Sequence, residues 1–187
     1  MIMMMGRWWL ALGSHPHRHE YLVMELSGPW ASLDEVNVDA SFLPNSGTAA
    51  LAMVGRNSNA EICLGSVWHC MALSPLMAEA LALLKATQYV INMGLHQVIF
   101  ETDNQSLISR IQQPATPITW DAKSFLMDIR QVSKHHLGFA FNYVPRENNR
   151  VADWVARTSL KGQCPSYWAH RPPNLLLSLL TQDGLYT

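Results

Sequence analysis

The chain has 187 residues, of which 49% are hydrophobic and 14% charged, with a formal net charge of -1 and an isoelectric point near 6.7. This composition excludes an intrinsically disordered chain and leaves room for one ordinary domain. The near-neutral charge gives no electrostatic case for nucleic acid, so any such case must come from a local site. No apolar run reaches the roughly 18 residues of a membrane span. Three cysteines without a CxxC pair are typical of reduced thiols in an intracellular protein.

Residues 1–34 show no sustained hydrophobic period, and we expect them to form a loosely ordered leader. The start, MIMMMGRWWLALG, is a poor match to a signal peptide because it lacks a basic leader and a clear cleavage site. It is equally compatible with an arbitrary translation start upstream of the domain. The alternating His15, His17 and His19 have a spacing that could bind a transition metal. Because nothing nearby completes a site, a flexible polar stretch is the favoured interpretation.

From Glu35 onward the hydrophobic pattern becomes regular. The segment VNVDASF alternates, with Val36, Val38 and Ala40 on one side, and this alternation predicts a strand. PNSGT is typical of a turn, and AALAMVGR and EICLGSVWHC predict two more strands. Three strands joined by short turns indicate an antiparallel meander.

A helix, a strand and a second helix are predicted next. Ser74 followed by Pro75 predicts a helix start with the serine as N-cap, and Gly94 predicts the end of this helix. HQVIFET is a short apolar run that predicts a strand. Asp103 and Asn104 then precede a second helical segment, QSLISRIQ.

The remaining elements complete an α/β pattern. Thr119 is expected to cap a third helix that runs from Trp120 to about His135. GFAFNYV alternates like a strand, and a last helix covers roughly Asn149 to Leu160. Antiparallel strands followed by helical crossovers predict a mixed sheet with helices packed on it.

We place one domain at residues 35–160 and a C-terminal tail at residues 161–187. The tail carries an apolar stretch, LLLSLL, which we expect to pack on the domain or on a partner. Three tryptophans are expected to lie in the core or between packed helices rather than to stack on bases. They are Trp68, Trp120 and Trp154.

Four carboxylates stand among small or apolar neighbours, where a solvated charge is not expected. They are Asp39 in the first strand, Glu79 in the first long helix, Asp103 at the end of the fourth strand and Asp153 in the last helix. Acidic residues that folding brings together repel and raise one another's pKa unless a cation neutralises them. Magnesium suits such a cluster because it prefers hard oxygen ligands and keeps positions open for water and phosphate.

Each carboxylate also has a purely structural explanation. Asp103 could cap the next helix, and Glu79 could lie at the exposed edge of its own helix. Asp153 could pair with Arg150 or Arg157 on its own helix. The aspartate of the first strand is hardest to explain in this way, because strand interiors disfavour aspartate. No single carboxylate therefore establishes a metal site, and the hypothesis of a shared site depends on the four carboxylates as a set.

The segments VDASF, AEALAL, ETDNQSL and VPRENNRVADWVA, in that order and on those elements, resemble the ribonuclease H family. The resemblance covers about residues 35–160 and is nearest to the plant branch related to the ribonuclease H part of non-LTR retrotransposon polyproteins. Four motifs on matching elements are far more specific than any one alone. The resemblance implies a ribonuclease H-like fold, in which helices flank a five-stranded mixed sheet.

The resemblance also implies a site and a reaction. Its catalytic and metal-binding quartet falls on Asp39, Glu79, Asp103 and Asp153, which would hold two magnesium ions that manganese can replace. The implied reaction is endonucleolytic hydrolysis of the RNA strand of an RNA–DNA hybrid, which leaves a 3′-hydroxyl and a 5′-phosphate. The implied partner is nucleic acid rather than a membrane, and we expect a monomer in the nucleus or the cytoplasm.

Three asparagines lie where the family often meets its substrate. Asn45 follows the first strand and Asn104 follows Asp103, and both positions often touch the hybrid in the family. Asn149, one helical turn before Asp153, can hydrogen-bond the substrate or orient the site. The 2′-hydroxyl is the group that would separate RNA from DNA.

Tyr143 departs from the family pattern, because many ribonucleases H carry a histidine at the corresponding position. A tyrosine is a poor proton shuttle near neutral pH, so we expect the replacement to affect turnover rather than metal binding. The chain also has no Lys/Arg cluster, which predicts a modest, salt-sensitive affinity for nucleic acid.

Two other interpretations remain open. One is a catalytically weak or inactive retroelement-derived domain that still binds nucleic acid or protein, and the other is an exonuclease on the same fold. VPRENNRVAD favours ribonuclease H over the exonuclease, and the intact quartet argues against an inactive domain.

Overall fold

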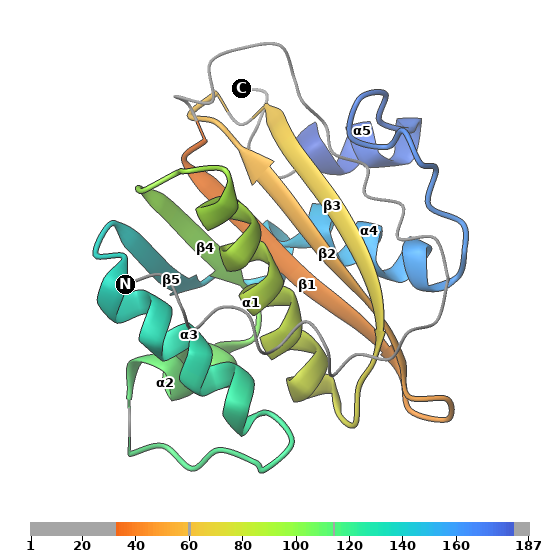
Figure 1. Ribbon diagram of the computed structural model, residues 1–187. Helices are drawn as coiled ribbons and strands as arrows, with labels where there is room; N and C mark the ends of the chain where they lie inside the picture. Colours follow the sequence, from red (N-terminus) through yellow and green to blue (C-terminus); the bar gives the residue numbers. More distant parts are fainter. Residues whose placement is uncertain (1–32, 60, 114, 182–187) are drawn as a thin grey trace.

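A five-stranded mixed sheet forms the centre of the computed structural model, which describes residues 33–59, 61–113 and 115–181 (Figure 1). The first three strands pair in antiparallel fashion, the fourth pairs in parallel with the first, and the fifth pairs in parallel with the fourth. The strand order is therefore β3-β2-β1-β4-β5, and the predicted fold class is confirmed. The strands are β1 (Glu35–Leu43), β2 (Thr48–Arg56), β3 (Ile62–Met71), β4 (Val98–Thr102) and β5 (Phe139–Tyr143).

Helices cover both faces of this sheet. The first three helices pack on one face, and the last two lie on the other (Figure 1). A short 3-10 turn, η2 (Arg146–Asn148), connects β5 to the helix that follows it. The helices are α1 (Pro75–Asn92), α2 (Gln105–Gln112), α3 (Lys123–His135), α4 (Arg150–Leu160) and α5 (Asn174–Leu180).

Local signals set the ends of α1 as predicted. The Ser74 hydroxyl accepts a hydrogen bond from the Met77 amide at 3.1 Å, and Pro75 occupies the first turn. At the other end Gly94 takes a left-handed conformation with φ of 74°, which glycine adopts without steric cost.

The prediction for the third helix was wrong at its start. Helix α3 begins at Lys123 instead of Trp120, and Thr119 contributes its backbone carbonyl to a turn by accepting a bond from the Ala122 amide. The side chain of Asp121 accepts a bond from the Ser74 hydroxyl at the start of α1. This contact links the turn that precedes Lys123 to the start of α1.

The larger core lies between the sheet and helices α1 to α3. Val36 and Val38 of β1 point into this core, and they alternate with Asn37 and Asp39 along the strand. Buried side chains from every strand and from all three helices meet there. The largest of them are Phe100, Leu51, Met53, Leu64, Leu83, Leu107, Leu126 and Ile129.

A second core lies on the opposite face and includes the tail. Trp168, only 3% exposed, packs together with α4, α5 and β2. A Cβ added at Gly65 of β3 would lie 2.5 Å from the Trp168 ring, so the indole rests directly against the glycine. The LLLSLL stretch lies in α5, and its Leu176 and Leu180 are buried in the same core. The tail therefore packs on the domain, the first of the two alternatives that the sequence left open.

The three tryptophans considered above have different surroundings. Trp68 is half-buried against the larger core, with its ring centroid 6.3 Å from that of Tyr89, and Trp154 packs against the second core. Trp120 is 80% exposed, which contradicts the prediction that it is a core or helix-packing residue. It lies in the turn before α3 rather than on the apolar face of that helix.

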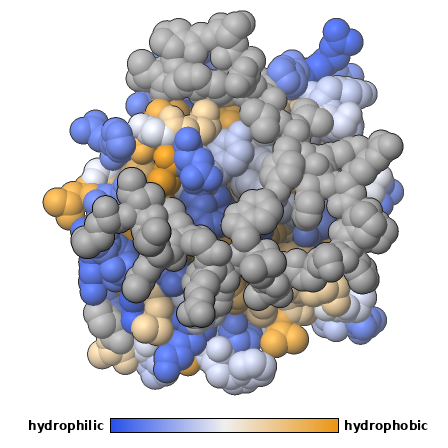
Figure 2. All heavy atoms as spheres, in the orientation of Figure 1, coloured by the Kyte–Doolittle hydropathy of each residue, from blue (hydrophilic) through white to orange (hydrophobic). Residues whose placement is uncertain are grey.

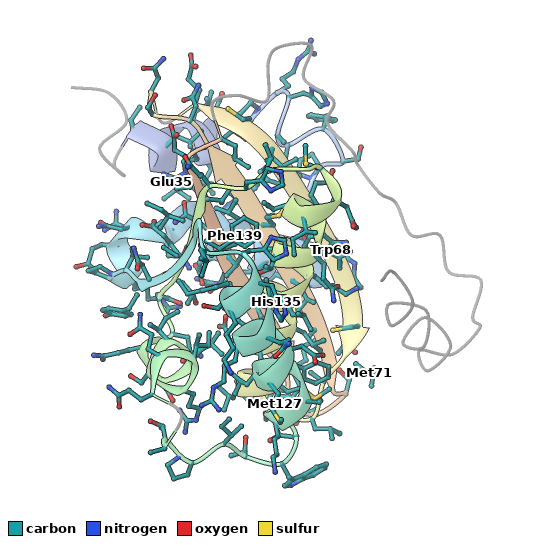
Figure 3. All side chains as sticks on the ribbon, turned by 60° about the vertical axis from the view of Figure 1, so that its left-hand side comes forward. Glu35, Trp68, Met71, Met127, His135 and Phe139 are labelled. Carbon is teal, nitrogen blue, oxygen red and sulfur yellow. The ribbon has the colours of Figure 1, made fainter. Side chains whose placement is uncertain are left out.

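The described surface mixes polar and apolar groups. Hydrophobic atoms are interspersed among hydrophilic ones on the face seen in Figure 2. Met71 at the end of β3 is 65% exposed and Met127 on α3 is 54% exposed (Figure 3). Across residues 33–59, 61–113 and 115–181, no helix has both the length and the apolar character needed to span a membrane. Most of the predicted leader, including its three histidines, lies outside the described residues. Of its last two residues, which are described, Leu33 is buried in the larger core.

The contact between Trp168 and Gly65 predicts that the tail contributes to global stability. We expect Trp168→Ala to lower the free energy of unfolding by roughly 3–5 kcal/mol, because it opens a cavity in the second core. Trp120→Ala removes the same group from an exposed position, and we expect a change of less than about 0.5 kcal/mol. Urea unfolding of both variants measures the difference, and equal effects would show that the tail is not part of the cooperative unit.

Candidate functional site

Three carboxylates from different elements converge at one end of the sheet. Asp39 lies on β1, Glu79 on α1, and Asp103 directly after β4. Each offers a carboxylate oxygen that lies within 4.8 Å of the other two. The parallel pairing of β1 with β4 brings the two aspartates together, and the first turns of α1 add the glutamate. The structure therefore unites three of the four predicted carboxylates.

Asp39 is almost entirely buried, with 5% exposure. Burial raises the pKa of Asp39 from 3.8 to about 8, and the neighbouring Asp103 and Asp153 contribute to the same rise. Two unit charges about 5 Å apart repel by roughly 3 kcal/mol at an effective dielectric constant of about 20. The three converging carboxylates therefore cannot all be ionised at low cost unless positive charge is supplied.

Glu79 has an unsatisfied carboxylate oxygen at this site. Its Oε2 atom is buried and has no hydrogen-bond partner. Burial raises the pKa of Glu79 well above its ordinary value, as do Asp39 and Asp103, while a backbone hydrogen bond from Ala40 opposes the rise. The alternative in which Glu79 occupies the exposed edge of its helix is therefore wrong.

Asp103 does not cap the helix that follows it. Asn104 is the N-cap of α2, and its Oδ1 accepts a hydrogen bond from the Leu107 amide at 3.0 Å. Asp103 remains half-buried, and burial raises its pKa, while the charge of Arg146 and a hydrogen bond with the Asn149 side chain lower it. Its carboxylate is thus available to the site.

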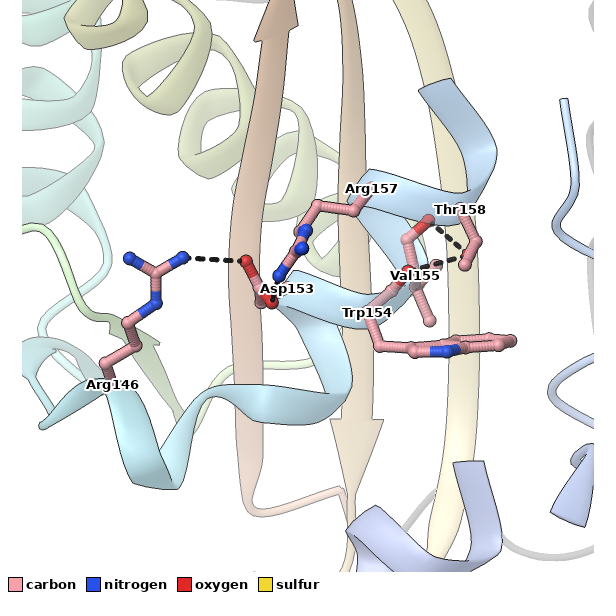
Figure 4. Close-up of polar contacts among 6 residues, drawn as sticks. All are labelled: Arg146, Asp153, Trp154, Val155, Arg157 and Thr158. Atoms are coloured by element: carbon pink, nitrogen blue, oxygen red, sulfur yellow. Dashed lines mark hydrogen bonds and ion pairs between the residues drawn. The ribbon is translucent and has the colours of Figure 1, made fainter. Parts of the chain in front are cut away.

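Asp153 lies beside this group and forms ion pairs with two arginines (Figure 4). Its Oδ2 accepts a bond from Arg157 at 3.1 Å, as one of the structural alternatives predicted, and its Oδ1 accepts a bond from Arg146 at 3.2 Å. Asp153 is not part of the group within 4.8 Å, yet its charge raises the pKa of the other three carboxylates. The fourth predicted residue is therefore adjacent to the cluster and electrostatically coupled to it.

Arg146 is the residue of this site that the sequence did not identify. Its seven-residue distance from Asp153 is not a neighbour spacing on a helix. The 3-10 turn η2 folds the chain back between β5 and α4, and this turn places the guanidinium next to the carboxylate. Pro145, immediately before the turn, is the only local signal of that reversal.

The three predicted asparagines occupy different environments. Asn45 is exposed in the turn between β1 and β2. Asn104 is half-buried at the start of α2, where its side-chain oxygen is used as a cap. Asn149 is fully buried, and its Nδ2 donates to the Val38 carbonyl at 3.0 Å. This bond ties the start of α4 to the strand that carries Asp39.

Tyr143, at the end of β5, is 44% exposed. It precedes the turn that carries Arg146, so it lies on the connection between the last strand and the helix of Asp153. His135 and His136 precede β5, whereas Tyr143 is its last residue, so these two histidines and Tyr143 lie at opposite ends of the strand.

The donor set fits a magnesium ion. All three ligand groups are carboxylates, which are hard oxygen donors, and their oxygens are close enough to share one ion. A divalent cation would also satisfy the unpartnered Oε2 of Glu79 and relieve the repulsion around Asp39. The residues that would hold such an ion are Asp39, Glu79 and Asp103.

A family model described as reverse transcriptase-like matches residues 37–159, and the chain belongs to this family. A search of the curated proteins found no match. Among solved structures, ribonuclease H1 from the halophilic archaeon Halobacterium salinarum superposes with a TM-score of 0.63 at 20% identity, over 68% of this chain and 97% of the archaeal one.

Two further structures show the same likeness. The N-terminal ribonuclease H domain of a Mycobacterium tuberculosis protein has a TM-score of 0.60 at 15% identity, over 70% of this chain and 96% of that one. LC11-RNase H1, solved in complex with an RNA/DNA hybrid, has a TM-score of 0.62 at 17% identity, over 68% and 96% of the two chains. At these identities the likeness establishes the fold, which is ribonuclease H-like as the motifs predicted.

The raised pKa of Asp39 predicts a pH-dependent stability in the absence of divalent ions. The folded state retains a proton that the unfolded state loses above pH 3.8, so stability should fall as pH rises from there through about 8. Asp39→Asn removes this penalty, and we expect it to raise the free energy of unfolding by roughly 2 kcal/mol at the alkaline end of that window.

The measurement is urea unfolding of both proteins in EDTA across that window, repeated with magnesium. Magnesium should stabilise the wild-type protein and leave Asp39→Asn nearly unchanged. Parallel pH profiles for the two proteins would show that Asp39 does not carry the predicted penalty.

Proposed function

We propose that this protein is a magnesium-dependent endoribonuclease that hydrolyses the RNA strand of an RNA–DNA hybrid. The observation that carries the proposal is the meeting of Asp39, Glu79 and Asp103 within 4.8 Å, with one carboxylate oxygen of Glu79 buried and unpartnered. This cluster lies on a ribonuclease H-like fold, and one structural neighbour was solved with an RNA/DNA hybrid.

In this proposal the four carboxylates serve as metal ligands. Asp39, Glu79 and Asp103 would hold the first cation, and Asp153 would contribute to holding the second. Two bound magnesium ions, or manganese in their place, would lower the pKa of a water and stabilise the leaving oxygen. The water oxygen joins the phosphorus, the bond from phosphorus to the 3′ oxygen breaks, and that oxygen takes up a proton. The products carry a 3′-hydroxyl and a 5′-phosphate.

The asparagines have separate roles in the proposal. Asn45 and Asn104 contact the nucleic acid. The exposure of Asn45 on the β1–β2 turn supports its role. Asn149 positions the site instead, because it is fully buried and bonds to the Val38 carbonyl next to Asp39. The protein acts as a monomer on nucleic acid.

A second candidate function is a catalytically weak retroelement-derived domain that binds nucleic acid without efficient cleavage. Tyr143 in place of the family histidine favours it, and so does the pairing of Asp153 with two arginines. The two candidates share the fold and differ in whether the RNA strand is cut.

Cleavage of an end-labelled RNA–DNA hybrid tests the first proposal. We expect the RNA strand alone to be cut in magnesium and in manganese, and we expect Asp103→Asn to lower the rate by roughly a hundred-fold or more, because it removes a metal ligand. Asp128→Asn, on the outside of α3, is the matched control and should cleave like the wild-type protein. A folded protein that leaves the hybrid intact at high concentration would favour the second candidate.

Tyr143 gives a separate prediction about rate. We expect Tyr143→His to raise steady-state cleavage by roughly ten-fold, because an imidazole can accept and release a proton near neutral pH. Tyr143→Phe should match the wild-type rate, since the phenol takes no part in proton transfer. The rate is measured against pH for all three proteins, and the histidine variant should gain a new inflection near pH 6–7. A Tyr143→Phe variant that loses activity would assign the phenol a role.

A further inference from the structure

Two arginines occupy both oxygens of Asp153, the one predicted ligand that lies outside the three-carboxylate group. Arg146 donates to Oδ1 at 3.2 Å, and Arg157 donates to Oδ2 at 3.1 Å (Figure 4). The side chain of Asp153 is 18% exposed. Both oxygens of Asp153 already have a cationic partner, so a metal ion that needs Asp153 must compete with a guanidinium.

The two arginines are not equivalent. Arg157 lies on the same helix as Asp153 at (i, i+4) spacing, so α4 itself holds this pair together. Arg146 comes from the three-residue turn η2, and its side chain is 71% exposed against 57% for Arg157. Arg146 is therefore the more exposed partner, and it reaches Asp153 from a separate turn rather than from the same helix.

The charge of Arg146 also acts on the rest of the site. It lowers the pKa of both Asp39 and Asp103, whereas Arg157 opposes only the rise at Asp39. In turn, Asp153 and the other two aspartates raise the pKa of the Arg146 guanidinium. Arg146 thus gives the aspartates of the site a nearby positive charge, as a second cation would do.

Arg146 can also bind a different anion. A guanidinium matches the geometry of a phosphate oxygen pair, and an exposed ion pair contributes little to stability, so it is exchanged easily. The substrate of the proposed reaction brings such phosphates to this end of the sheet.

We propose that Arg146 is a movable counter-ion that neutralises Asp153 when the site lacks cations and transfers to a backbone phosphate when nucleic acid binds. Its departure frees the Oδ1 atom of Asp153 for a metal ion while Arg157 stays on Oδ2, so substrate and second-ion binding favour each other. The transfer to phosphate rests on the proposed function, whereas the competition between Arg146 and a cation does not.

A manganese titration without nucleic acid tests the competition. Free Mn²⁺ is followed by electron paramagnetic resonance for the wild-type protein, Arg146→Gln, Arg146→Lys and Arg171→Gln. We expect Arg146→Gln to tighten the weaker Mn²⁺-binding step by roughly three-fold or more, since the competing charge is gone. Arg146→Lys retains the charge and should remain near the wild-type affinity. Arg171→Gln removes an equal charge from an exposed position in the tail and should have no effect.

The salt dependence of hybrid binding tests the transfer. Fluorescence anisotropy in EDTA gives the slope of log affinity against log salt for the same four proteins. We expect Arg146→Gln to reduce this slope by about one phosphate contact, and Arg171→Gln to leave it unchanged.

The outcomes separate the two parts of the proposal. If Arg146→Gln binds Mn²⁺ like the wild-type protein, or if neither protein binds Mn²⁺, the counter-ion role is overturned. If Mn²⁺ binds more tightly but the salt slope is unchanged, the transfer to phosphate is overturned. A protein that binds no hybrid refutes the proposed function, and the Mn²⁺ titration still decides the competition at Asp153.

Discussion

Repulsion between carboxylates that are held together away from water is the constraint on which the end of this sheet depends. The parallel pairing of β1 and β4 fixes Asp39 and Asp103 side by side, and a hydrogen bond of 2.8 Å from Asn37 to Glu101 joins the same strands two residues earlier. Each close pair of charges opposes folding by a few kcal/mol, a large share of the total stability of roughly 5–15 kcal/mol of a domain. The cores on both faces of the sheet must offset this repulsion.

The site relieves the same repulsion in three ways. Protonation is one, because burial, together with the charges of Asp103 and Asp153, raises the pKa of Asp39 to about 8. The arginines at Asp153 are another, since they place positive charge at the rim without entering the buried group. A cation is the third, and it would also give the unpartnered oxygen of Glu79 a partner. These three sources of positive charge compete for the same carboxylates. A change in pH, in metal concentration or in bound phosphate therefore changes how much each source contributes.

Much of this arrangement followed from the sequence because the signals were local. Alternation in the strands, the Ser74–Pro75 start and Gly94 located the elements correctly, and the four motifs identified the fold. The failures concerned contacts between distant segments. Trp120 is exposed in the turn before α3, where the adjacent Asp121 bonds to Ser74 of a distant segment, and no pattern near Trp120 reports that bond. Likewise, the position of Arg146 at Asp153 depends on the reversal at η2, and a helical-spacing argument considers only partners on the same helix.

The packing of Trp168 against Gly65 has a consequence for the order in which the chain folds. The larger core draws on residues between 33 and 141, so it can close while the rest of the chain is still being synthesised. The second core includes Trp168, Leu176 and Leu180. The face of β2 and β3 that these residues cover stays uncovered by them until the chain has been synthesised past Leu180. During translation this half of the sheet therefore presents apolar strand surface to its surroundings until residues 168–180 have been synthesised.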